Sequence, residues 1–172
     1  KTHQAKPVIC WLLRLICAVM FAGHGWMCWN EQMPLHALLQ DEPLMATLVK
    51  NFFHMDWKDW LAIKVSDNID TAIRAQAWIF FFFAAATLAP LRNWFMAIIF
   101  LLGSANLVFL AWLKYFDTGE GVGHFFEHAG QFCLPLIVYL IVFGKGWRFP
   151  VSMVAGIAIA LTFVCHALLA ID

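Results

Sequence analysis

Five long apolar stretches constrain the fold of this chain more than any other feature of its sequence. They cover residues 7–29, 75–91, 94–115, 124–143 and 149–171, and they include runs such as MAIIFLLGSANLVFLAWL and LPLIVYLIVFG. A helix needs about 20 mostly apolar residues to cross the hydrocarbon core of a bilayer. It also satisfies its own backbone hydrogen bonds there, which an isolated strand cannot do. The stretches predict an all-α, polytopic membrane protein, a bundle of five transmembrane helices that forms one domain over residues 1–172.

Composition supports a membrane protein and excludes a nucleic-acid partner. Hydrophobic residues make up 63% of the chain and charged residues 13%, whereas a soluble domain averages about 45–50% and 25%. The 11 Lys and Arg residues balance 11 Asp and Glu residues, so there is no excess of positive charge to neutralise phosphates. The five cysteines include no CxxC pair, which argues against a disulfide framework or a zinc ribbon. Membrane lipid is the expected surrounding.

Charges that flank the spans predict the orientation of the chain. Lys1 and Lys6 precede the first span, Arg92 follows the second, and Lys145 and Arg148 lie between the fourth and fifth. No acidic residue accompanies them, while segment 30–72 carries seven acidic residues and three lysines. Basic residues favour the cytoplasmic side. We therefore expect a bacterial inner-membrane protein with a cytoplasmic N-terminus and an extracytoplasmic 30–72 loop.

The 30–72 loop is the largest element expected outside the membrane. Its apolar residues recur at near-helical spacing and include Leu35, Leu38, Leu39, Leu44, Leu48, Val49, Phe52 and Phe53. This pattern predicts one or two amphipathic helices on the outer membrane surface. The loop can act as a lid over the helix ends, or it can dock other membrane or periplasmic subunits.

Polar side chains within the spans are concentrated toward one leaflet. In the inner half of the predicted bundle the polar residue is Arg14, and we expect its side chain to snorkel to the interface. The polar residues of the outer half are His24, Arg74, Gln76, Asn106, His124, Glu127, His128, Gln131 and His166. A charge at mid-membrane costs about 2.5–3.5 kcal/mol on the insertion scale, so such residues are candidates for a site. The alternative is an interhelical hydrogen-bond network that holds the bundle together.

Several ligands remain open for an outer-leaflet pocket. Haem would need two facing histidines from the set His24, His128 and His166. A non-haem transition metal could use His24, His124, Glu127, His128 and His166. A quinone would need a His and an amide among aromatic rings, and the candidates are His24, Asn106, His128, Gln131 and His166.

The fourth predicted span contains a second motif. Residues 124–128 read HFFEH, which matches the H-x-x-E-H signature of inverted zinc proteases. A zinc-dependent membrane hydrolase is therefore a lesser alternative, although spacing identifies no third ligand. Pro135 removes a backbone hydrogen bond to the carbonyl of Gln131 and predicts a kink in this helix.

The first and fifth predicted spans resemble each other. Residues 16–29 read ICAVMFAGHGWMCW and residues 158–171 read AIALTFVCHALLAI, which aligns His24 with His166 and Phe21 with Phe163. Internal repeats in membrane proteins place binding sites at the repeat interface. We expect the fifth span to begin a second unit and the native protein to continue beyond Asp172.

Two short motifs resemble the DoxX-like family of membrane proteins. Arg14-Leu15 opens the first span and Gly23-His24-Gly25 closes it, and Glu127, His128 and Gln131 form an E-H-x-x-Q element like that of larger relatives. The resemblance implies a compact four-helix form and membrane-bound redox work, such as thiosulfate–quinone chemistry or an accessory role beside an oxidase. Five helices and a long loop depart from that form.

These features leave three classes of function. The first is a redox-linked membrane subunit whose outer-leaflet pocket binds a quinone, haem or a metal and receives electrons from a partner. The second is a non-catalytic accessory or scaffold subunit in which the polar cluster is structural. The third, a transporter, is disfavoured because only Arg14 supplies an ionisable group in the inner half.

Overall fold

The computed structural model describes residues 7–30, 39, 41–90, 94–118, 123–143 and 148–169, and every regular element within those ranges is helical. Three of these helices are long and apolar enough to cross a membrane. They are α1 (Pro7–Trp29), α5 (Ile63–Leu88) with its apolar part Ile69–Leu88, and α6 (Trp94–Thr118) with its apolar part Trp94–Tyr115. The prediction of an all-helical chain is confirmed for the described residues, and three of its helices are candidate membrane spans.

The fourth and fifth predicted spans correspond to shorter apolar helices. The expected helix over residues 124–143 is divided into α7 (Gly123–Glu127) and α8 (Ala129–Phe143), with His128 in a turn between them. The last helix is α9 (Arg148–Leu169). Their apolar parts are Ala129–Val142 and Val151–Cys165.

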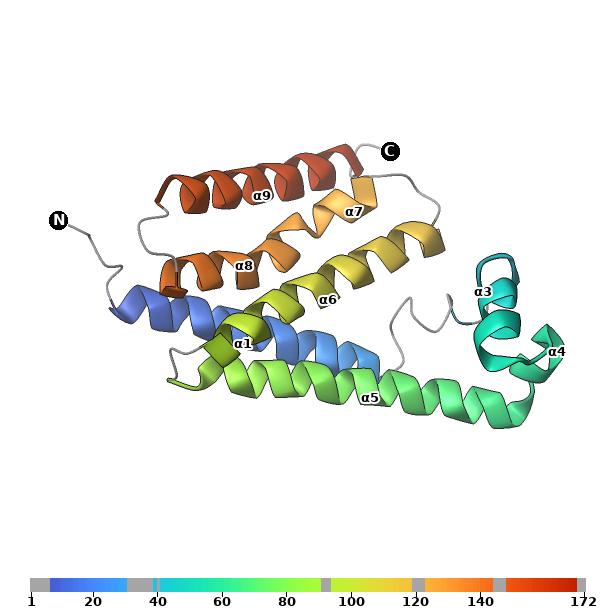
Figure 1. Cartoon of the computed structure of the whole chain (residues 1–172). Coiled ribbons are helices and arrows are strands. Elements are labelled where there is room, and N and C mark those ends of the chain that lie inside the picture. The colour runs from blue at the N-terminus through green and yellow to red at the C-terminus, as the bar shows by residue number, and fades with distance from the viewer. Residues whose placement is uncertain are drawn as a thin grey trace.

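Successive long helices alternate in direction. Figure 1 shows α1, α6 and α9 running one way, while α5 and the α7–α8 segment run the other way. Helix α1 packs on α5, α5 on α6, α6 on α8, and α8 back on α1, so four helices form a closed ring. Helix α9 packs on α7 and α8 at the periphery of this ring. We call the two ends of the bundle the Pro7 end and the Trp29 end, after the first and last residues of α1.

Aromatic side chains fill the centre of the ring. Phe21 of α1 is fully buried, and its ring centroid lies 6.2 Å from that of Phe80 and 5.6 Å from that of Phe83, both in α5. Gly103 of α6 faces the same ring so closely that an added Cβ would overlap the Phe21 ring. The absence of a side chain at Gly103 therefore lets α6 approach α1 across a bulky aromatic core.

The outer surfaces of the long helices are apolar as well. Large hydrophobic side chains on α1, α5, α6 and α9 are exposed, among them Val19, Trp26, Trp78, Ile79, Leu102, Ile157 and Phe163. Such a surface would aggregate in water, whereas lipid chains cover it without cost. The exterior is thus consistent with a protein that is embedded in a membrane.

Short helices follow one another at the Trp29 end, beside the start of α5 (Figure 1). They are α3 (Glu42–Leu48), the π-helix η1 (Val49–Phe53), which ends at His54 in the left-handed conformation, and α4 (Trp57–Trp60). The indole Nε1–H of Trp60 donates to the carbonyl of Leu39 at 2.8 Å, and Val49 and Trp60 are buried. We call residues 41–62 the aromatic cap.

The boundaries of α5 differ from those expected from hydropathy. The largely polar composition of segment 63–72 predicts a loop, yet Ile69 and Ile73 are buried at helical spacing and the segment belongs to α5. At the other end the helix stops at Leu88 because Ala89 is extended, with φ −63° and ψ 132°. Ala89 precedes Pro90, and a residue before proline avoids the helical conformation.

Candidate functional site

The turn at His128, which separates α7 from α8, lies among the polar residues of the Trp29 end. The amides of Gln131 and Phe132 both donate to the carbonyl of His128, at 2.9 and 3.2 Å. The amide of Gly130 instead donates to Thr162 Oγ1 of α9 at 2.9 Å, and that hydroxyl donates to the carbonyl of Ala158. A side chain from a neighbouring helix thus satisfies a backbone group that the interruption releases, as the interior of a bilayer requires.

A second side chain supports the same helix near its proline. Pro135 has no N–H, so the helical ladder of α8 is incomplete one turn before it. The Ser104 hydroxyl of α6 donates to the carbonyl of Phe132. Helix α8 is therefore held by a hydroxyl from α6 on one side and by a hydroxyl from α9 on another.

His128 and Gln131 form an imidazole–amide pair at the interruption. The Nδ1–H of His128 donates to Gln131 Oε1 at 3.2 Å. The Nε2 atom of His128 lies inside the protein, whereas the Gln131 side chain is exposed. With Oε1 engaged, the amide nitrogen of Gln131 is the group presented to the surroundings, and it carries two donor hydrogens.

Three phenylalanine rings accompany this pair. The ring centroid of Phe125 lies 5.3 Å from that of Phe126 and 5.5 Å from that of Phe132. All three phenylalanines are half-buried, while Gln131 in the same segment is exposed. We call His128, Gln131 and these three rings the His128 cluster.

Asn106 pairs with Gln76 rather than with a histidine. The Gln76 Nε2–H of α5 donates to Asn106 Oδ1 of α6 at 2.8 Å, and both side chains are half-buried. The sequence showed both residues as polar groups in the outer half of apolar helices. It contained no signal that they bond to each other.

His24 lies at a depth similar to that of Asn106. Both residues are three positions beyond the contact of Phe21 with Gly103, in helices that run in the same direction (Figure 1). The Nδ1–H of His24 donates to the carbonyl of Met20 at 2.9 Å, and the ring centroid lies 5.5 Å from that of the buried Phe80. In the neutral ring, Nε2 then carries the lone pair.

The metal hypotheses receive no support from the described side chains. Among the residues whose placement is described, no three His, Cys, Asp or Glu side chains are arranged to hold a metal ion. The side chains of His124, Glu127 and His166 lie outside the described set, so the prediction that they converge with His24 and His128 stays a prediction.

The H-x-x-E-H signature covers α7 and the residue after it. Helix α7 contains His124 and Glu127 and ends at Glu127, and His128 lies in the turn that follows. The side chains of His124 and Glu127 lie outside the described set, so the zinc-hydrolase alternative stays a prediction.

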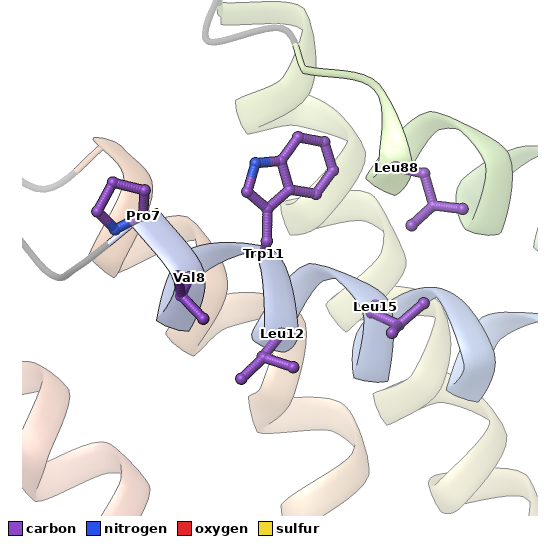
Figure 2. A pocket seen from close by; sticks show the side chains of 6 residues that line it. All are labelled: Pro7, Val8, Trp11, Leu12, Leu15 and Leu88. Carbon is purple, nitrogen blue, oxygen red and sulfur yellow. The ribbon is translucent and has the colours of Figure 1, made fainter.

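Arg14 is buried, with 6% of the residue exposed. Its guanidinium donates to the carbonyl of Ala89 just beyond the C-terminal end of α5, where helix carbonyls favour a cation. It also lies 5.8 Å from the centroid of the Trp11 ring. Trp11 and Leu88 line an apolar groove of about 380 Å³ at the Pro7 end, and Figure 2 shows the side chains that border it.

A scan against protein-family models, a search of curated proteins and a search of solved structures found no match to this chain.

Proposed function

We propose that this chain is a five-span, redox-linked membrane subunit and that the His128 cluster binds the ring of a quinone at the outer side of the membrane. The observation that carries the proposal is the exposed Gln131 side chain, bonded to the His128 imidazole in the same segment as three phenylalanine rings that pack together through Phe125. A quinone ring presents a carbonyl that accepts a hydrogen bond and two flat faces that pack against aromatic rings. Gln131 would supply the donor, and His128 would position it.

The interrupted helix adds support for a site at this position. Irregular backbone within a membrane occurs where protein surrounds it or where it lines a cavity, and discontinuous helices in transporters are often binding elements. Here Ser104 and Thr162 stabilise the irregular segment from two neighbouring helices. A bound quinone would exchange electrons with a donor that a partner subunit supplies.

The arrangement of the helices agrees with the proposed relationship to DoxX-like proteins. Helices α1, α5, α6 and α8 form a closed ring of four, which is the compact form that the resemblance implies. In this proposal α7 extends α8, α9 is the fifth span, the Trp29 end is extracytoplasmic, and the Pro7 end faces the cytoplasm of a bacterial cell.

A structural role is the second candidate, and the pair of Gln76 and Asn106 favours it. These two amides bond to each other between α5 and α6 at 2.8 Å, as expected of polar groups that join transmembrane helices. In an accessory or scaffold subunit the His128 cluster would likewise only join helices.

Titration with a soluble short-chain benzoquinone, ubiquinone-1, distinguishes the two candidates. Binding to the purified chain in detergent is measured by calorimetry. One hydrogen bond contributes about 0.5–1.5 kcal/mol, so we expect Gln131→Leu to weaken binding by about 2–10-fold. His128→Ala should weaken binding less, since it releases the amide without removing the donor.

His54→Asn is the matched control, because His54 is an exposed histidine in the aromatic cap and asparagine tolerates its positive φ of 54°. Its affinity should equal that of the wild type. If the wild-type chain does not bind ubiquinone-1, or if Gln131→Leu and His54→Asn bind equally well, the quinone proposal is wrong and the structural role is preferred.

A further inference from the structure

Arg74 carries a positive charge within the apolar part of α5. That part begins at Ile69, and Arg74 lies five residues beyond it and is exposed. At about 1.5 Å per residue, Arg74 is about 7.5 Å along the apolar part. A charge among acyl chains is costly, whereas a long basic side chain can extend toward the headgroup layer and meet an anion there. The phosphate of a phospholipid is the anion present at that level of the membrane.

A row of aromatic side chains from α1 and α5 positions the guanidinium of Arg74. Its Cζ atom lies 5.9 Å from the centroid of the Trp29 ring at the end of α1, which is a cation–π distance. The Trp29 ring meets that of Trp78 edge to face at a centroid distance of 5.9 Å, and Trp78 meets Phe81 in the same way at 5.9 Å. The row ends against α1, where a Cβ added to Gly25 would lie 2.8 Å from the Phe81 ring. Two packed helices therefore hold the guanidinium before any ligand binds, which lowers the entropic cost of binding.

The same row offers an aromatic surface to the surroundings. Trp29 is 41% exposed and Trp78 is 63% exposed. Tryptophan is enriched where headgroups meet the hydrocarbon region of a membrane. A ligand bound to Arg74 would contact these indole rings, so an amphiphile with an apolar chain fits the surface better than a water-soluble anion does.

Asp70 adds the opposite charge one turn closer to the start of α5. It lies four residues before Arg74, so the two residues share a face of the helix, and about 6 Å separates them along the axis. The order of charges toward the membrane centre is therefore negative and then positive. A phosphatidylethanolamine headgroup has the complementary order, since its ammonium group lies outside its phosphate. Phosphatidylglycerol has the same phosphate and no cation.

We propose that Asp70, Arg74, Trp29 and Trp78 form a binding site for phosphatidylethanolamine at the Trp29 end. The guanidinium of Arg74 donates to the phosphate oxygens, the lipid ammonium group donates to the carboxylate of Asp70, and an acyl chain packs along Trp78. The site lies between α1 and α5 and includes no residue of the His128 cluster, so it is independent of the proposed quinone.

Titration of the full chain with lipid, followed by native mass spectrometry, tests this site. The chain is freed of lipid in detergent and mixed with dioleoylphosphatidylethanolamine or dioleoylphosphatidylglycerol. The wild type should bind the ethanolamine lipid more tightly than the glycerol lipid. Arg74→Gln should weaken binding of the ethanolamine lipid by about tenfold, because a hydrogen bond between charged groups is lost. Lys50→Gln is the matched control, since it removes one positive charge from an exposed residue of the aromatic cap, and its lipid affinities should equal those of the wild type.

Asp70→Asn distinguishes a lipid site from a contact that only joins two helices. It should lower the affinity for the ethanolamine lipid to that for the glycerol lipid, and the affinity for the glycerol lipid should not fall. If Arg74 only joins α5 to Trp29, Arg74→Gln will reduce thermal stability and bind both lipids as Lys50→Gln does, and the proposal is then wrong. A wild-type chain that binds the two lipids equally well overturns it, as does an Asp70→Asn chain that keeps the wild-type preference.

Discussion

Single residues decide how closely the helices of this bundle approach. Gly103 lies against the fully buried ring of Phe21, which is itself enclosed by Phe80 and Phe83. A ring in such surroundings cannot move aside without displacing other rings, because packed interiors contain few voids. The contact therefore depends on glycine at this position.

Gly103→Ala should destabilise the bundle by about 1–3 kcal/mol, the usual cost of extra volume in a packed core. Unfolding in mixed micelles, followed by circular dichroism, measures the change. Gly23→Ala introduces the same methyl group into open space and should not destabilise the chain. Phe21→Leu should reduce the cost of Gly103→Ala, and a full additive loss in the double variant would argue that the two residues do not interact.

At the scale of elements, the α7–α8 segment depends on hydroxyl groups from its neighbours. The amide of Gly130 is bonded to Thr162 Oγ1 of α9, and the carbonyl of Phe132 accepts from Ser104 of α6. An unsatisfied buried backbone group costs about 1–3 kcal/mol. The irregular helix and its two neighbours are therefore expected to unfold together.

Thr162→Val keeps the shape of the side chain and removes the hydroxyl. We expect it to destabilise the chain by about 1–3 kcal/mol, because the Gly130 amide loses its acceptor. Thr162→Ser should retain most of the stability. Unfolding in micelles compares the three proteins, and equal stability of Thr162→Val and the wild type would contradict the role given to this hydrogen bond.

The sequence was sufficient to predict the helical class and less informative about individual elements. Three long helices coincide with apolar runs because composition alone determines which segments can span a membrane. The interruption at His128 was not predicted, since the polar residues around it recur at helical spacing and the stabilising Thr162 lies 32 residues from Gly130. The partners of Asn106 and His24 likewise depend on tertiary packing, which no local pattern contains.

At the scale of the whole molecule, the two ends of the bundle differ in composition. The Trp29 end has the aromatic cap and the His128 cluster, while the described part of the Pro7 end has Arg14 bonded to the end of α5 and an apolar groove. In the sequence, Lys6 directly precedes α1 and Arg148 begins α9 with no acidic residue beside them, whereas segment 30–72 at the other end combines seven acidic residues with three lysines. This asymmetry is what the proposed orientation requires.

Cysteine labelling in spheroplasts of a bacterial host tests the orientation. Lys58 lies exposed in α4 of the aromatic cap, so Lys58→Cys should react with a membrane-impermeant maleimide in intact spheroplasts. Lys6→Cys should react only after permeabilisation. The unmodified chain gives the background from the native cysteines, and labelling of Lys6→Cys in intact spheroplasts would reverse the proposed topology.

The polar first turns of α5 affect how a soluble partner could contact the aromatic cap. The helix begins at Ile63, while its apolar part begins at Ile69, and six residues at about 1.5 Å each add about 9 Å of rigid rod. A lipid headgroup layer is about 5–8 Å thick. In the proposed orientation this rod holds the aromatic cap, whose Phe52 and Phe53 are exposed, near the outer edge of the headgroups, where a partner in the aqueous phase could reach these rings without entering the bilayer.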